Sequence, residues 1–402
     1  MNESRRHRLV VLGAGYAGAY AAGILARRLS PNDVEITVVN AEPDFVQRLR
    51  LHQLAAGQEV EAPKLTDVFA GTGINLRLAR VLDIDPTRQI VGVADADGGE
   101  EIGYDTLVYA LGSSGAFQVP GADTYAFDIA SRPAALRLRR RLEALSRSGR
   151  GGEVVVVGDG LTGIETAAEI AESRPELAVT LVAHGELGAR LSAGARRHLH
   201  RTYDRLGVTV VEHARVESVE DTRVLCSDGT VLPADATAWT AGFAVSPIAA
   251  ASGLDVTDSG QIVVDRMMRS TSHPNVYAVG DSAHAIGDNG KPLPMSCGSA
   301  GYTCRQAIEA IIGELTGRDI PTTKLVYPGN HISLGRKDAI LQMVDEQGRP
   351  KPRYVGGRRA VRFKAAVLRI ALWAVAHPTF GLPRRRLRLA TSSEPVAERV
   401  AA

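Results

Sequence analysis

Two short glycine-rich stretches in the sequence have the residue types and spacing that bind a pyrophosphate. In the first, Gly13, Gly15 and Gly18 follow a predicted strand at residues 8–12, apolar from Leu9, and precede an alanine-rich segment that is predicted to be helical to about Leu29. The first glycine makes a tight turn, the second lets the backbone approach the phosphates, and the third lets the helix pack on the strand. The phosphates then meet the positive end of the helix. The predicted site comprises Gly13, Ala14, Gly15, Tyr16, Ala17 and Gly18.

The second stretch repeats this spacing 145 residues later, after the apolar run 154–157. Two motifs of this kind, each framed by a strand and a helix, are much rarer by chance than one. They predict two dinucleotides bound in one chain, and therefore electron transfer between them. The second site is predicted to comprise Gly158, Gly160, Thr162 and Gly163.

Both sites lack the acidic residue that usually ends the following strand and binds the ribose hydroxyls. The strand at residues 35–39 ends at Asn40, whose amide can do part of that task. The strand at residues 179–182 is followed by Ala183 and His184. His184 and Arg190 either lie near a 2′-phosphate or are solvated surface residues, so the choice between NADH and NADPH stays open at this stage.

Composition and charge are typical of a globular protein rather than of a disulfide-rich or membrane-spanning one. The chain has 402 residues, of which 45% are hydrophobic and 23% charged, which is typical of a globular protein with more than one domain. Its three cysteines form no disulfide framework, and no zinc-finger spacing occurs, so no metal site is predicted. The sequence shows neither an apolar signal segment nor a membrane-spanning run. We expect a cytoplasmic protein that does not bind nucleic acid.

Three further motifs, together with the two glycine-rich stretches, follow one another in an order that resembles a known family of proteins. Residues 104–112 (YDTLVYALG), 238–242 (AWTAG) and 275–281 (NVYAVGD) resemble the two connectors and the second FAD motif of flavoproteins with two dinucleotide domains. Over residues 8–320 the chain is most similar to type II NADH dehydrogenases and apoptosis-inducing-factor-like reductases. The resemblance implies an α/β fold with two Rossmann-type three-layer domains, as in glutathione reductase, the second inserted in the first. It also implies FAD in the first site and NADH or NADPH in the second.

The same resemblance assigns roles to individual residues. Asp281 would accept a hydrogen bond from the FAD ribityl chain, with Gly280 allowing close approach, and Glu165 would lie beside the nicotinamide and the flavin. Cys297 and Gly298 would begin a helix that points at the flavin; Cys297 is either a reactive thiol or, as the alternative, a buried inert one. Further cofactor contacts are expected from Arg48, His52, Val81, Ala110, Gly112 and Gly242.

Departures from the family patterns bear on the electron acceptor. Residues 41–110 contain no cysteine, which excludes the redox-active pair of the disulfide reductases. The two glutamines that usually mark the quinone end of type II enzymes are absent from residues 294–301. A quinone or quinone-like small molecule is the first expectation. The alternatives are a soluble reductase of a specialised metabolite or carrier protein, and a flavoprotein that senses NAD(H) without turnover.

The order of motifs predicts a discontinuous FAD domain, 1–115 and 246–320, with an NAD(P)H domain at 116–245 between its two parts. Residues 321–402 would form a small α+β element, with strands within 325–345, a basic amphipathic helix at 358–376 and a disordered tail from Thr391. Residues 349–393 contain no Asp or Glu. The helix would therefore either lie on an anionic membrane surface, peripheral to the inner face of the cell membrane, or pack on the flavin domain or across a homodimer.

Overall fold

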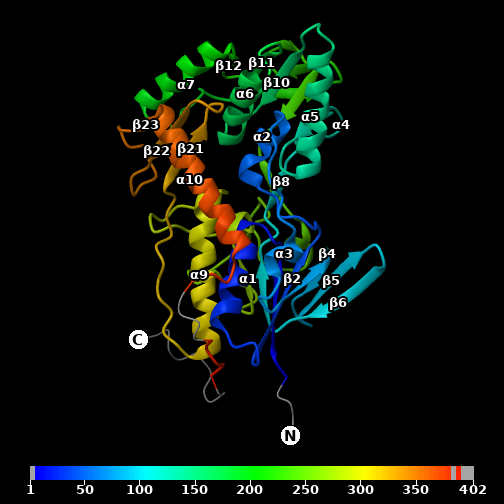
Figure 1. The fold of residues 1–402 in the computed structure, drawn as a ribbon, viewed down its shortest axis with the longest axis vertical. Coiled ribbons are helices and arrows are strands. Elements are labelled where there is room, and N and C mark those ends of the chain that lie inside the picture. Colours follow the sequence, from blue (N-terminus) through cyan, green and yellow to red (C-terminus); the bar gives the residue numbers. More distant parts are fainter. Residues whose placement is uncertain (1–4, 382–385, 391–402) are drawn as a thin grey trace.

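Two parallel five-stranded sheets form the framework of the molecule. The structure, a computed structural model, describes residues 5–381 and 386–390. In Figure 1 one sheet lies in the lower half and the other in the upper half, and the C-terminal helix runs between the two. Each sheet follows the strand–turn–helix pattern that the glycine motifs predict. The α/β fold class with two Rossmann-type units is thereby confirmed.

The lower sheet contains the first glycine motif. Its central strand is almost completely buried, as expected for a parallel sheet covered on both faces. Helices α1 (Tyr16–Arg28) and α9 (Cys297–Thr316) pack against each other on one face, and an antiparallel sheet of β4 (Arg80–Asp85), β5 (Ile90–Asp95) and β6 (Gly98–Gly103) extends from the unit. The strand order is β19 (Val276–Ala278), β7 (Thr106–Tyr109), β1 (His7–Leu12), β2 (Val34–Asn40) and β3 (Ile74–Leu78).

The upper sheet contains the second glycine motif. Helix α6 (Leu161–Ser173) follows its central strand, and the sheet is accompanied by α4 (Ala122–Tyr125), α5 (Arg132–Arg147) and α7 (Ala193–Leu206). A small antiparallel sheet is formed by β13 (Val216–Val219), β14 (Arg223–Cys226) and β15 (Val231–Pro233). The main order is β12 (Thr209–Val211), β11 (Ala178–Val182), β10 (Glu153–Val157), β16 (Ala236–Trp239) and β9 (Ala126–Asp128).

Two antiparallel strands carry the chain between the two units. β8 (Ser113–Gly115) leads into the upper unit and pairs with β17 (Phe243–Val245), which leads back. After the return come α8 (Ile248–Ala251), the pair β18 (Ile262–Val263) and β20 (Ala283–His284), and the short helix η2 (Gly280–Ser282). The upper unit is thus inserted in the lower one, and we propose β8 and β17 as the domain boundary.

One segment crosses that boundary in space. After η1 (Arg48–Arg50), helix α2 (Leu51–Ala55) contacts α5 and α6, and Leu51, Leu54 and Val60 join the hydrophobic core of the upper unit. The chain returns to the lower unit at α3 (Leu65–Phe69). A boundary drawn along the sequence therefore does not describe where residues 51–60 pack.

The C-terminal element bridges the two units. Strands β21 (Gly329–Ser333), β22 (Ala339–Met343) and β23 (Val355–Gly356) form an antiparallel sheet, and α10 (Gly357–Ala376) runs from it to α1 (Figure 1). The structure has two strands within residues 325–345 and a helix that begins one residue earlier than expected. The predicted disordered tail from Thr391 lies outside the described residues. No helix in residues 5–381 and 386–390 has both the length and the apolarity needed to span a membrane.

Candidate active site between the two units

A cavity of about 2480 Å³ runs from one glycine turn to the other. It is larger than the roughly 300–1,000 Å³ typical of a single-ligand pocket, which fits two dinucleotides. Gly18 and Gly163 stay outside its lining, consistent with their predicted part in helix packing. The predicted site residues that line it are Gly13, Ala14, Gly15, Tyr16, Ala17, Asn40, Arg48, His52, Val81, Ala110, Gly112, Gly158, Gly160, Thr162, Glu165, His184, Gly242, Gly280, Asp281, Cys297 and Gly298.

The first glycine turn has the shape that a pyrophosphate requires. Gly13 has a φ of 94°, in the region that favours glycine, and a Cβ at Gly18 would clash with the Gly13 carbonyl oxygen. A Cβ at Gly15 would meet open space, so the backbone there is free to contact a ligand. No side chain caps the first turn of α1, which also contains no acidic residue. Its free N–H groups therefore fit the FAD phosphates, and the second turn at α6 repeats the arrangement.

Both polar groups of the Asn40 side chain form hydrogen bonds with nearby backbone groups. Its Oδ1 accepts a hydrogen bond from the Ala14 backbone N–H at 2.8 Å, and its Nδ2 donates to the Glu42 carbonyl oxygen at 2.7 Å. The amide thereby fixes the glycine turn, and its contact with ribose stays a prediction. Glu42 is exposed and lines the cavity two residues beyond the expected acidic position, so the sequence pattern missed it.

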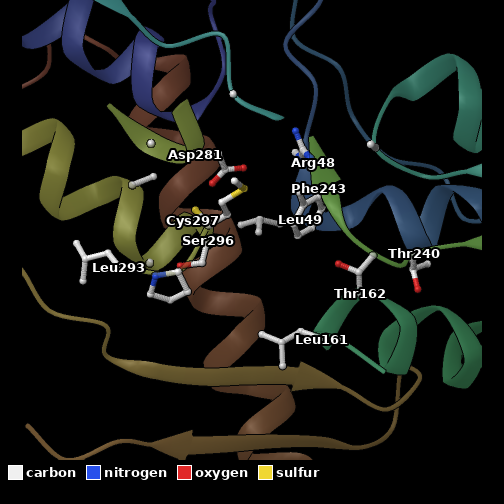
Figure 2. A pocket seen from close by; sticks show the side chains of 18 of the residues that line it. Arg48, Leu49, Leu161, Thr162, Thr240, Phe243, Asp281, Leu293, Ser296 and Cys297 are labelled. Carbon is white, nitrogen blue, oxygen red and sulfur yellow. The ribbon is translucent and has the colours of Figure 1, made fainter. Parts of the chain in front are cut away.

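Arg48 and Asp281 meet through Ser113, at the start of the strand that leads into the upper unit. The Ser113 hydroxyl donates to Asp281 Oδ2 at 2.7 Å and accepts from Arg48 Nη2 at 2.9 Å. The guanidinium also lies 5.5 Å from the ring centroid of Phe243, on the returning strand. Figure 2 shows Arg48, Phe243 and Asp281 around the cavity. Arg48 and Asp281, both predicted to contact the cofactor, are thus positioned by the two strands that connect the units.

Cys297 is the first residue of α9, and Ser296 caps that helix by accepting a hydrogen bond from the Ser299 N–H at 3.1 Å. The N-terminus of α9 faces the cavity across from Leu161 and Thr162 at the start of α6 (Figure 2). Burial, with a contribution from Asp281, raises the pKa of the Cys297 thiol to about 11. The thiol is protonated at neutral pH, which favours the inert alternative over a reactive nucleophile.

Glu165 forms a buried cluster with residues from three segments. Lys364 Nζ on α10 donates to its Oε1, the Ser333 backbone N–H donates to the same oxygen at 2.9 Å, and His52 Nδ1 lies 3.8 Å from its Oε2. Lys364 Nζ also donates to the His331 carbonyl oxygen at 3.1 Å. Glu165 and Lys364 are only 9% and 8% exposed. A glutamate on a helix would more often be a surface charge, whereas this one is part of an ion pair in the cavity wall.

The electrostatics of this cluster depend on Lys364. Burial acts to raise the pKa of Glu165, but the Lys364 ammonium and the hydrogen bonds from Lys364 and Ser333 outweigh it, so the pKa is lowered. Burial lowers the pKa of His52 to about 4, so the imidazole is neutral at pH 7 and contributes little to holding Glu165 ionised. His52 Nδ1 thus faces Glu165, while its Nε2 has no hydrogen-bond partner among the described residues, and its contact with FAD stays a prediction.

Comparison with known proteins places the chain in a family. Residues 7–304 match the family model described as pyridine nucleotide-disulphide oxidoreductase. Demethylphylloquinone reductase of Synechocystis is 26% identical over 350 residues, which cover 84% of this chain and 86% of that protein. A type II NADH:quinone oxidoreductase of Staphylococcus haemolyticus is 27% identical over 368 residues, which cover 83% of this chain and 89% of that protein.

Solved structures agree in fold. NDH2 of Plasmodium falciparum in complex with NADH has a TM-score of 0.77 at 15% identity, with 92% of this chain and 98% of that chain covered. The sulfide:quinone oxidoreductase of Aquifex aeolicus has a TM-score of 0.76 at 19% identity, with 93% of each chain covered.

The fold and the paired glycine turns define an FAD-dependent oxidoreductase that uses NADH or NADPH. The chain belongs to the pyridine nucleotide-disulphide oxidoreductase family, and the predicted resemblance to NADH dehydrogenase-like enzymes is confirmed.

Proposed function

We propose that this enzyme reduces a quinone or quinone-like lipophilic molecule at a membrane surface. The observation that carries the proposal is the position of α10. Lys364, Val367 and Leu368 of this helix line the cavity, and the same helix exposes a row of apolar side chains. A lipophilic acceptor can therefore move along the apolar face of α10 to reach the cavity.

The exposed face of α10 has the composition of an interfacial helix. Phe363, Ile370 and Trp373 are 50%, 66% and 44% exposed, and Phe380 just beyond the helix is 65% exposed. The helix buries only Ala360, Lys364 and Val375. Arg358, Arg359, Arg362 and Arg369 add positive charge without any acidic residue in the segment. Apolar burial together with attraction to anionic headgroups stabilises such a helix on a bilayer.

In the proposal, the buried ion pair provides the hydrogen-bond or proton donor that quinone reduction requires. FAD, when bound, supplies a carrier that takes a hydride from the nicotinamide and passes on two electrons. A reduced quinone gains negative charge on its oxygens and must be protonated. Lys364 is a buried ammonium in the cavity wall, and Glu165 holds it in place. In the proposal, Lys364 donates a hydrogen bond or proton to the acceptor oxygen, and Glu165 orients the nicotinamide as the resemblance implies.

The names of two relatives support the same acceptor class, since one is a demethylphylloquinone reductase and another a type II NADH:quinone oxidoreductase. The missing glutamines at residues 294–301 favour the competing function, reduction of a soluble metabolite or carrier protein. The second competing function, redox sensing, requires slow reoxidation with every acceptor.

The test is steady-state oxidation of NADH and NADPH by the FAD-loaded protein with a short-chain ubiquinone, with and without anionic liposomes. We expect turnover to rise with liposomes that co-sediment with the protein. Ile370→Glu with Trp373→Glu should abolish co-sedimentation. Val231→Glu is the matched control, because Val231 is 51% exposed on β15 and outside the cavity.

Three outcomes would contradict the proposal. Rapid flavin reduction with negligible quinone turnover would favour a soluble acceptor. Slow reoxidation by quinones, oxygen and ferricyanide alike would favour sensing. If the two glutamate substitutions instead convert a dimer to a monomer in analytical ultracentrifugation while liposome binding is absent from the native protein, the exposed face of α10 is covered by a second copy of the chain.

A further inference from the structure

The edge of the upper sheet brings together two loops that are distant in sequence. The Ala183 N–H, just after β11, donates to the Val211 carbonyl oxygen at 2.8 Å, and the Ala214 N–H, after β12, donates to the Ala183 carbonyl oxygen at 3.0 Å. The Asp159 carboxylate accepts from the Gly185 N–H at 3.4 Å, which ties the glycine turn to the same place. His184 and Arg215 therefore extend from adjoining segments, and both line the cavity.

This edge carries two arginines that form no ion pair with a carboxylate of the described residues. His184, Arg190 and Arg215 are exposed and line the cavity, and none of them forms an ion pair with any residue in the ranges 5–381 and 386–390. The nearby carboxylates are engaged elsewhere. Glu186 pairs with Arg196 at 2.5 Å, and Glu212 accepts the Leu187 N–H at 2.7 Å.

The position that would select NADH is apolar. In dinucleotide-binding folds an Asp or Glu at the end of the second strand accepts the ribose hydroxyls and repels a 2′-phosphate. Here that position is Ala183, which is fully buried, and the next side chain is His184. Asp159 is the remaining carboxylate on this part of the cavity, and its hydrogen bond with Gly185 directs it toward the loop backbone.

We infer that His184, Arg190 and Arg215 form a subsite for the 2′-phosphate of NADPH, so that NADPH is the preferred coenzyme. The inference rests on the nicotinamide site of the proposed function and deepens it by naming the coenzyme. A 2′-phosphate carries a charge of about −1.5 to −2 near neutral pH and offers three acceptor oxygens. Guanidinium groups bind such a group through two parallel hydrogen bonds. The adenosine ribose of NADH has only hydroxyl groups at this position, so it offers no phosphate for the two arginines to bind.

The binding test uses fragments that lack the nicotinamide, so it does not depend on turnover. Calorimetry with the FAD-loaded protein compares 2′,5′-ADP with 5′-AMP. We expect at least about tenfold tighter binding of 2′,5′-ADP, with Arg215→Ala and Arg190→Ala each weakening it about fivefold to tenfold and leaving 5′-AMP unchanged. Arg201→Ala is the matched control, because Arg201 is an exposed arginine on α7 outside the cavity. Equal binding of the two fragments would overturn the inference.

Anaerobic stopped-flow measurement of flavin reduction separates this inference from the proposed function. Faster reduction by NADPH than by NADH at low coenzyme concentration, with the difference lost in Arg215→Ala, is the expected result. Reduction that is equal with both coenzymes or faster with NADH overturns the 2′-phosphate subsite but leaves the proposed function standing. Absence of flavin reduction with either coenzyme contradicts the proposed function itself.

Discussion

Replacing Lys364 with methionine would leave the Glu165 carboxylate buried without the ammonium that neutralises it. Removing one partner of a buried ion pair costs about 3–5 kcal/mol of stability. The side chains of Lys364 and Glu165 are only 10% and 11% exposed, so solvent screening reduces this figure little. The Ser333 N–H still donates to Glu165, which favours the lower end, about 3 kcal/mol. Glu165→Gln in the same chain should recover most of that loss, because it removes the uncompensated charge.

The loss of stability caused by Lys364→Met should depend on pH in a defined direction. The pKa of Glu165 is lowered from 4.5 in the native protein, so its favourable contribution is present above pH 4.5 and lost as the pH falls below it. In Lys364→Met the burial of Glu165 raises its pKa instead, so stability falls as the pH rises above 4.5. The difference between native and variant protein is therefore largest at neutral pH and shrinks in acid.

Urea unfolding of protein labelled with 5-fluorotryptophan provides the assay. The chain has two tryptophans, and Trp373 lies on α10 with Lys364 while Trp239 lies on β16. Separate fluorine signals report the two regions, which matters because a chain with two units need not unfold in one step. An unchanged Trp373 midpoint in Lys364→Met at pH 7, or no recovery with Glu165→Gln, would refute the reasoning.

Three further predictions concern other parts of the cavity. Gly18→Ala should lower the FAD content of purified protein, measured by absorbance, because the added methyl clashes with the Gly13 carbonyl oxygen. Cys297→Ser should keep flavin reduction within about twofold, and alkylation of native Cys297 should accelerate only toward its pKa of about 11. Burial, together with Glu172, raises the pKa of Glu169 from 4.5 to about 7, so native stability should fall by about 3 kcal/mol as the pH rises through that range. Glu169→Gln should flatten this dependence in urea midpoints at pH 5 and 8.

The sequence predicts those parts of the site that depend on local pattern. Gly13, Gly15 and Gly18 are recognisable because their function requires a fixed spacing within a single strand–turn–helix unit. Lys364 was missed because its partner Glu165 lies 199 residues away, and a lysine in a basic helix has the pattern of a solvated residue. Arg215 was missed for the same reason, since its position beside His184 depends on backbone hydrogen bonds between two loops.

The packing of residues 51–60 in the upper unit was also beyond the sequence patterns. The apolar positions of α2 show that the helix has a buried face, but not which of two hydrophobic cores receives it. Similarly, the resemblance predicts a cofactor contact for His52 but does not show that tertiary packing buries its imidazole beside Glu165. In each case the sequence indicates that a side chain is buried, and the fold decides its neighbours.

Helix α10 is attached at both of its ends. In its first half Lys364 contacts Glu165 of the upper unit, and just past its end a Cβ at Gly23 of α1 would clash with Pro378. A rigid rod pinned to both units resists their rotation about β8 and β17. The spacing between the two nucleotides would then be constant through the catalytic cycle. Coenzyme and acceptor would then reach the cavity without a rotation of one unit against the other.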